Sequence, residues 1–323
     1  MTDQVSNQVS NQLARPAPQT EPPAAPDARP ILHFAHANSF PAGTYRLFFE
    51  HLSAHYDVRA LPLHAHNPAY PVDDGWKALS RELSDGLAER YQSPVILVGH
   101  SLGGILSVRA AMRRPDLVRC VVLLDSPLVG GWRAAVLGAM KIFKFESSHA
   151  PSRFSIRRRN VWPDREATYQ HFATKGVFAA WPPEVLHDYV ENGLVPYKSA
   201  ESTGDAEDGV TLRFSREIET AIYRSIPHDL GGLVQSRYPV PIGFVGGIDS
   251  VECRMAGLAA TRRLVGDNFV QIPGGHLFPM LTPLAAAGAT HGMIQRLLGK
   301  QAAAAPVAMA PTAPAIAPDR AGG

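Results

Sequence analysis

The chain has 323 residues, 45% of them hydrophobic and 19% charged, a composition typical of one globular domain with an insertion or of two small domains. Its 31 basic and 29 acidic residues leave a net charge of +2, which excludes a strong overall field for binding nucleic acid or an anionic membrane. The sequence contains neither the apolar run of about 18 to 20 residues that a membrane span needs nor a recognisable secretory signal.

The cysteines Cys120 and Cys253 stand alone, without Cys-x-x-Cys spacing or a ligand-spaced histidine beside either of them. We therefore expect two free thiols in a reducing compartment and a cytoplasmic location. The histidines likewise lack metal-ligand spacing, so we expect neither a metal nor another cofactor.

Composition divides the chain into segments. Residues 1–29 are polar and then rich in Pro and Ala, and residues 301–323 consist largely of Ala and Pro. Both lack the apolar periodicity that offsets the entropy of ordering, so we expect disordered tails. Between them we expect an α/β core formed by residues 30–126 and 227–300, interrupted by a cap over residues 127–226.

Strand and helix patterns alternate along the two core segments. Short apolar runs predict strands over residues 30–34, 56–61, 95–98, 118–124, 242–247 and 269–272. Apolar residues at helical spacing predict helices from about residue 44 and over residues 75–91, 103–114, 253–265 and 284–298. This alternation indicates a doubly wound, mostly parallel α/β sheet.

The alternation stops over residues 127–226, where helical stretches near 166–178 and 183–192 predict a helical cap. We interpret its tryptophans, Trp132, Trp162 and Trp181, as packing residues that roof an apolar pocket. The basic run over residues 153–159 is interpreted as a solvated face, with an anionic substrate group as the alternative.

The segment from Val95 to Gly104 is a buried-type strand that breaks into Gly-x-Ser-x-Gly and then into a helical pattern. A serine on such a turn projects its hydroxyl from the end of the sheet, and Gly99 and Gly103 keep the tight backbone path clear of side chains. Ser101 is therefore the candidate nucleophile.

A serine hydroxyl needs an imidazole to accept its proton and a carboxylate to orient that imidazole. His276 follows the last predicted strand and Asp249 follows the strand before it. Loops after parallel strands emerge on one edge of the sheet, so Ser101, Asp249 and His276 can converge there. Asp125, also at the end of a predicted strand, is the alternative acid.

The order Ser, Asp, His and the elbow around Ser101 resemble the α/β-hydrolase fold superfamily over about residues 30–300. The resemblance favours Asp249 over Asp125 and implies an oxyanion hole formed by the backbone N–H groups of Asn38 and Leu102. Ala37 replaces the glycine of the superfamily's oxyanion loop. We expect the ordered part of the chain to begin at what would be the superfamily's third strand, which suggests a sheet of six parallel strands without the usual first hairpin.

These residues predict a serine hydrolase that cleaves a small or medium carboxylic ester, with an apolar acyl compound as its small-molecule partner and no nucleic-acid partner. Acyltransferase, lactonase and C–C bond hydrolase remain open on the same three residues, as does a binding protein that retains the fold without turnover. The substrate and the oligomeric state do not follow from the sequence.

Overall fold

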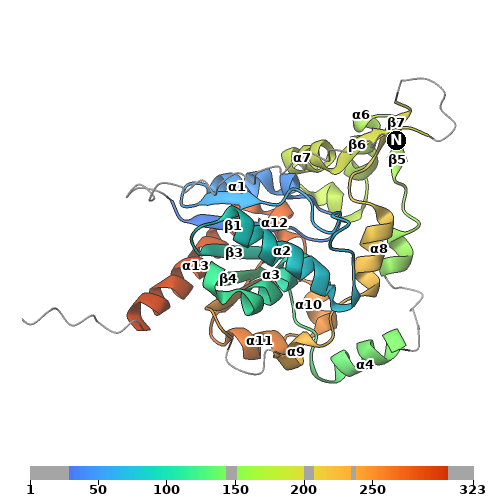
Figure 1. Ribbon diagram of the computed structural model, residues 1–323. Helices are drawn as coiled ribbons and strands as arrows, with labels where there is room; N and C mark the ends of the chain where they lie inside the picture. The colour runs from blue at the N-terminus through green and yellow to red at the C-terminus, as the bar shows by residue number, and fades with distance from the viewer. Residues whose placement is uncertain (1–28, 143–150, 200–206, 234–237, 305–323) are drawn as a thin grey trace, which may run out of the picture.

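A computed structural model describes residues 29–142, 151–199, 207–233 and 238–304 (Figure 1). Most of the two expected tails, residues 1–28 and 305–323, lies outside the described residues. The C-terminal helix α13 (Pro283–Ala304) continues past its expected end at residue 298 and enters the stretch expected to be a tail.

The centre of the fold is a six-stranded sheet in the order β2-β1-β3-β4-β8-β9, in which every neighbouring pair is parallel. Its strands are β1 (Ile31–Ala35), β2 (Asp57–Ala60), β3 (Val95–His100), β4 (Val118–Leu124), β8 (Ile242–Gly247) and β9 (Phe269–Ile272). The predicted doubly wound sheet of six parallel strands is confirmed.

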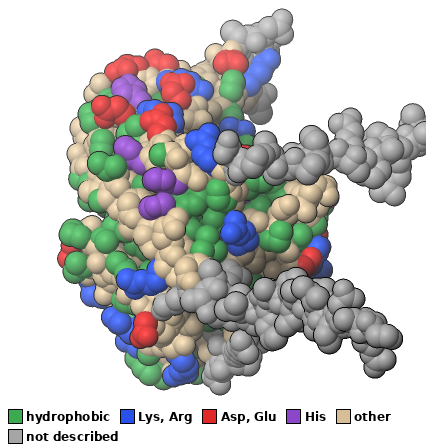
Figure 2. All heavy atoms as spheres, turned by 90° about the vertical axis from the view of Figure 1, so that its left-hand side faces the viewer, with side chains coloured by type: hydrophobic (Ala, Val, Ile, Leu, Met, Phe, Trp, Pro, Cys, Tyr) green, Lys and Arg blue, Asp and Glu red, His purple; other side chains and the backbone are tan. Residues whose placement is uncertain are grey.

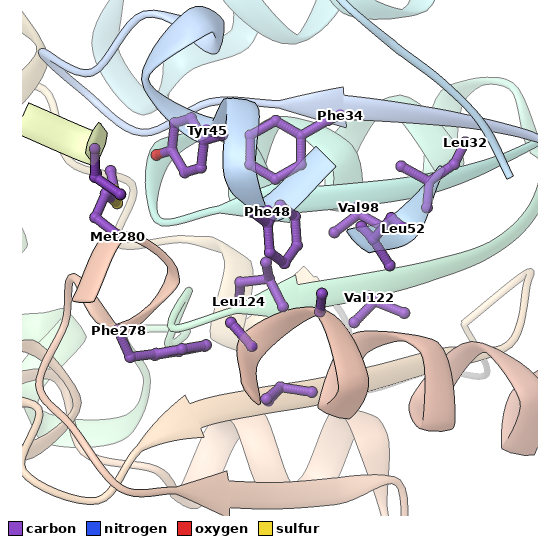
Figure 3. Close-up of a cluster of buried hydrophobic side chains, with 14 of the residues drawn as sticks. Leu32, Phe34, Tyr45, Phe48, Leu52, Val98, Val122, Leu124, Phe278 and Met280 are labelled. Atoms are coloured by element: carbon purple, nitrogen blue, oxygen red, sulfur yellow. The ribbon is translucent and has the colours of Figure 1, made fainter. Parts of the chain in front are cut away.

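Successive side chains of the strands point to opposite faces of the sheet. In β3, Ile96 and Val98 belong to one buried hydrophobic cluster, and Val95 and Leu97 belong to the other. The two clusters bury both faces, which is why these strands are near-continuous apolar runs. Figure 3 shows part of the first cluster, where Phe34 and Phe48 lie beside Val98 and Leu124.

Helices cover both faces. Helices α1 (Arg46–Leu52) and α13 pack on the first cluster, and α2 (Lys77–Arg90), α3 (Leu102–Arg113) and α11 (Ala259–Val265) pack on the second. The shorter core elements are η1 (Ala42–Tyr45), η2 (Asp74–Trp76), η3 (Pro115–Leu117), α10 (Val251–Ala256) and α12 (Phe278–Leu281).

An insertion separates β4 from β8. Its elements are α4 (Gly131–Ile142), α5 (Pro151–Ser155), β5 (Val161–Trp162), α6 (Arg165–Ala173), η4 (Gly176–Ala180), α7 (Pro183–Gly193), β6 (Leu194–Tyr197), β7 (Gly209–Leu212), α8 (Arg216–Arg224) and α9 (Leu230–Leu233). The helices were predicted in outline. The antiparallel sheet β5-β7-β6 was not predicted, because strands of two to four residues carry too little alternation to be recognised.

The insertion lies toward the carboxyl ends of the central strands (Figure 1). Phe40, in the loop after β1, packs against Phe178, Trp181 and Tyr189 of the insertion. Trp162 and Trp181 are buried as expected of packing residues, whereas Trp132 on α4 is 68% exposed. Aromatic packing therefore joins the insertion to the core beside the edge that carries the candidate site.

Figure 2 shows the side of the molecule that faces left in Figure 1, where acidic, basic and histidine side chains are interspersed with apolar ones. In the part of the chain that the structure describes, no helix is both long enough and apolar enough to cross a membrane.

Candidate active site

Ser101 lies at the turn between β3 and α3, with φ of 52° and ψ of −114°. A positive φ is costly for a residue with a side chain, so the surrounding structure must enforce it. A Cβ atom on Gly103 would lie 2.0 Å from the carbonyl oxygen of Ala35, and one on Gly99 would lie 2.4 Å from the backbone of Gly103. The glycines therefore allow the close packing of backbones that holds the serine in this conformation.

The structure joins Ser101, His276 and Asp125 in one line of hydrogen bonds. Nδ1 of His276 lies 2.7 Å from Oδ2 of Asp125, and Nε2 lies 3.0 Å from Oγ of Ser101. Because a carboxylate only accepts, Nδ1 carries the proton, and Nε2 is left to accept the serine hydroxyl. This is the arrangement in which an imidazole removes the proton of an attacking serine.

Asp125 is fully buried at the end of β4, with φ of 43°. Its Oδ1 accepts the backbone N–H of Gly247 at 2.7 Å and the thiol of Cys253 at 3.3 Å, and its Oδ2 accepts the hydroxyl of Ser250 at 2.5 Å. Burial by itself raises the pKa of a carboxyl, but the hydrogen bond and charge of His276 and the bonds from Ser250 and Gly247 outweigh burial, so the pKa of Asp125 lies below its ordinary value. The carboxylate is thus held charged beside the histidine.

The expected preference for Asp249 over Asp125 is wrong in this structure. Asp249 lies beyond the end of β8 with its side chain exposed, and its backbone N–H donates to the carbonyl of Gly274. Gly246 and Gly247 explain the difference, because a Cβ on Gly246 would lie 3.3 Å from Oδ1 of Asp125 and one on Gly247 would lie 2.4 Å from the carbonyl oxygen of Gly274. Without these side chains the histidine loop comes close enough for Asp125 to reach His276.

The two candidate oxyanion donors come from separate segments of the chain. Leu102 is the first residue of α3, where backbone N–H groups have no partner within the helix and the helix dipole favours negative charge. Asn38 is buried in the loop after β1, and its side-chain Nδ2 donates to the backbone carbonyl of Glu219 in α8 at 3.3 Å. The insertion therefore contacts the loop that carries one of the candidate donors.

His36 holds this loop in place through two hydrogen bonds. Its Nδ1 lies 2.8 Å from the carbonyl oxygen of Ala37, and its Nε2 accepts the backbone N–H of His64 at 2.7 Å. Both ring nitrogens are engaged, and burial is the main reason that the pKa of His36 falls to about 4. His36 is thus neutral near pH 7 and holds the loop in place.

Four residues beside the site were not among the predicted catalytic or oxyanion residues. Ser250 and Cys253 hold Asp125, and Tyr45 and His100 form hydrogen bonds beside the elbow. Ser250 is also the N-cap of α10, where its hydroxyl accepts the backbone N–H of Cys253. A serine shortly after a predicted strand could have indicated the start of this helix, but not a contact with Asp125. The position of these residues beside Asp125 depends on the tertiary fold.

A cleft of about 350 Å³ lies between α5 and α8 and is lined by Pro151, Phe154, Ser155, Arg158, Glu219 and Tyr223. Inside it, Arg158 pairs with the carboxylate of Glu219 at 2.7 Å. Arg158 belongs to the basic run over residues 153–159 that was expected to be a solvated face, but it is partly buried in an ion pair. Asn38 bonds to the backbone of Glu219, so this cleft adjoins the candidate oxyanion loop.

Among the residues that the structure describes, one group offers metal ligands. Ligand atoms of Asp125, Glu252 and His276 lie within 4.8 Å of one another. However, Asp125 and His276 already share a proton across 2.7 Å, which a cation would have to displace. The absence of a functional metal stays a prediction.

A parallel sheet with a serine at a strand-to-helix elbow and a histidine beyond the last strand defines an α/β-hydrolase. The chain belongs to the Alpha/beta hydrolase family, whose model matches residues 34–289.

Curated relatives match parts of the chain. The sn-1-specific diacylglycerol lipase ABHD11 of Mus musculus is 36% identical over 76 residues, which are 24% of this chain and 24% of that protein. The type I acyl-CoA thioesterase mpaH of Penicillium roqueforti is 27% identical over 118 residues, or 36% of this chain and 25% of that protein. The matches thus span about a quarter of the length of these relatives.

Solved structures match over most of the chain. E-2-(acetamidomethylene)succinate hydrolase superposes with a TM-score of 0.65 and 23% identity, covering 83% of this chain and 92% of that one. At this identity the likeness shows the shared fold.

Proposed function

We propose that this protein is a serine hydrolase that cleaves a small or medium carboxylic ester through an acyl-serine intermediate. The observation that carries the proposal is the line of hydrogen bonds from Oγ of Ser101 through both nitrogens of His276 to Asp125. Family membership supports a hydrolase. The names of the two curated relatives, a lipase and a thioesterase, favour an acyl substrate.

In the proposed mechanism, Oγ of Ser101 attacks the ester carbonyl while Nε2 of His276 takes its proton. Asp125 stabilises the resulting imidazolium and keeps the ring oriented. The backbone N–H groups of Asn38 and Leu102 bind the oxygen that becomes negative in the tetrahedral intermediate. His276 then protonates the leaving alcohol, and water releases the acyl group by the reverse sequence.

We assign the insertion the role of a cap over the substrate site. Its helix α8 touches the oxyanion loop through Asn38, and its aromatic residues pack against Phe40 beside that loop. The cleft of about 350 Å³ between α5 and α8 offers space for a small-molecule substrate, with the apolar surfaces of Pro151 and Phe154 for its acyl part. The net charge of +2 and two buried free thiols support a cytoplasmic enzyme that does not bind nucleic acid.

A fluorophosphonate probe tests the proposed nucleophile. Wild-type protein is expected to be labelled covalently and to hydrolyse p-nitrophenyl esters, and Ser101→Ala is expected to lose both properties. Ser80→Ala is the matched control, because Ser80 is a buried serine of α2 whose hydroxyl bonds to the carbonyl of Trp76. Labelling of Ser101→Ala at the wild-type rate would refute the assignment.

The substrate class follows from a panel of esters, thioesters and lactones with different acyl lengths. Product analysis with an added alcohol or amine separates hydrolysis from acyl transfer, because an acyltransferase passes the acyl group to that nucleophile. Tight binding of an acyl compound by wild-type protein that neither labels nor turns over would favour a binding protein instead.

A further inference from the structure

His100, directly before Ser101, is fully buried and bridges two loops of the candidate site. Its Nε2 lies 2.9 Å from the backbone carbonyl oxygen of His276. A carbonyl only accepts hydrogen bonds, so Nε2 carries the proton and donates it. The side chain before the candidate nucleophile thus holds the main chain of the candidate base.

The other nitrogen of His100 is held by Tyr45. Nδ1 lies 2.8 Å from the hydroxyl oxygen of Tyr45. Burial and then the charge of His276 lower the pKa of His100 to about 3, so its ring is neutral near pH 7 and Nδ1 accepts. The tyrosine hydroxyl therefore donates to His100, and its oxygen accepts the backbone N–H of Ala37 at 3.2 Å.

These bonds form one directed chain, from the N–H of Ala37 through Tyr45 and His100 to the carbonyl of His276. Ala37 precedes the candidate oxyanion donor Asn38. The strands before the two loops, β1 and β9, are separated in the sheet by β3, β4 and β8. The two loops are therefore not held at a fixed distance by hydrogen bonds between adjacent strands. The buried hydrogen bonds of Tyr45 and His100 join them instead.

We propose that Tyr45 and His100 are positioning residues that hold the oxyanion loop, the nucleophile and the base in register. The inference rests on the proposed serine hydrolase function. Tyr45 and His100 touch no reacting atom in this role and act through the main chain of Ala37 and His276. Because these groups are buried and each bonds to the next one in the series, loss of one group leaves its neighbours without a partner.

Tyr45→Phe tests the proposal by removing the hydroxyl while keeping the ring. We expect kcat and the rate of fluorophosphonate labelling to fall by about 10- to 100-fold, with KM within about twofold, since small displacements at a reacting centre cost this much. Tyr91→Phe is a matched control, because Tyr91 also bonds a buried histidine, with its hydroxyl 2.8 Å from Nδ1 of His33. That pair involves strand residue His33 of β1 and the end of α2, so Tyr91→Phe is expected to alter stability and leave kcat unchanged.

His100→Asn and the double variant with Tyr45→Phe test whether the two residues act as a unit. The double variant is expected to lose no more activity than the poorer single variant, whereas independent roles would multiply the losses. The proposal would be overturned if the fold-losses of the two single variants multiply in the double variant. It would also be overturned if Tyr45→Phe and Tyr91→Phe lose kcat equally.

The tautomer of His100 provides a test in the wild-type protein, whatever the stability of the variants. Nitrogen NMR is expected to show a neutral ring with the proton on Nε2 between pH 8 and pH 5, and a proton on Nδ1 would contradict the chain. The two proposals fail separately. If wild-type protein is not labelled at Ser101, the hydrolase function fails, but if Tyr45→Phe is labelled at the wild-type rate, only the positioning role does.

Discussion

Nδ1 of His276 lies 2.7 Å from Oδ2 of the buried Asp125, and this pair sets which nitrogen of the imidazole faces Ser101. With the proton on Nδ1, the lone pair of Nε2 points at the serine hydroxyl. An amide in place of the carboxylate would donate to Nδ1 and force the proton onto Nε2, which then cannot accept from the serine.

Asp125→Asn is therefore expected to lower kcat by about 10³- to 10⁴-fold with little change in KM. Asp249→Asn is the matched control, because Asp249 is an exposed aspartate after the neighbouring strand β8. We expect the kcat of this variant to stay within about twofold of the wild-type value. Ester turnover and single-turnover labelling measure both variants. The reverse ranking would restore Asp249 as the acid.

Gly103→Ala is expected to destabilise the fold by at least about 3 kcal/mol, because its Cβ would lie 2.0 Å from the backbone oxygen of Ala35 and a backbone cannot move aside locally. Gly86→Ala, inside α2, is the control, since its Cβ would meet no described atom within 4 Å. We expect it to stabilise the fold by about 0.5–1 kcal/mol. Denaturant unfolding measures both, and equal stability of the two variants would contradict the close approach at the elbow.

Stability is expected to fall on acidification because buried histidines are neutral in the fold. Burial lowers the pKa of His33 and of His100 to about 3 and that of His36 to about 4. Their unfolded pKa is about 6.5, so below that pH the unfolded chain binds more protons and stability decreases until the folded pKa is reached. Each contributes a loss on the order of 2 kcal/mol between pH 7 and pH 5. Unfolding that is independent of pH over this range would be inconsistent with neutral buried rings.

His64→Leu is expected to stabilise the protein and to reduce this dependence on pH. His64 is fully buried, neither ring nitrogen has a hydrogen-bond partner among the described residues, and burial holds its pKa well below the ordinary value. Removing an unsatisfied buried polar group gains about 1–3 kcal/mol, and the backbone N–H of residue 64 can still donate to His36. His51→Leu on the exposed face of α1 is the control and is expected to change stability by less than about 0.5 kcal/mol.

Dialysis against EDTA is expected to leave kcat unchanged. Asp125, Glu252 and His276 are close enough to bind a cation, but the proton shared by Asp125 and His276 occupies the position that a metal would take. Added zinc is then expected to inhibit, and Glu252→Gln to weaken that inhibition by removing a ligand. Activity that is lost in EDTA and restored by zinc would assign the metal a functional role.

Much of the fold follows from local patterns in the chain. The bounds of β4, β8 and β9 agree with the apolar runs, because strands buried on both faces need continuous apolar residues. The elbow at Ser101 and the position of His276 beyond the last strand were likewise readable from short motifs. The helix expected over residues 253–265 is split into α10 and α11 at Gly257, whose φ is 73°.

By itself, the sequence determined the parallel sheet, the serine at its elbow and the histidine at its edge, because each depends on residues adjacent in the chain. Only the tertiary structure decided that Asp125 pairs with His276, and that Tyr45 and His100 link their loops. Both decisions depend on how closely separate loops approach after folding. That approach is set by the glycines at 246 and 247 and by buried hydrogen bonds between distant residues, which leave no periodic pattern in the sequence.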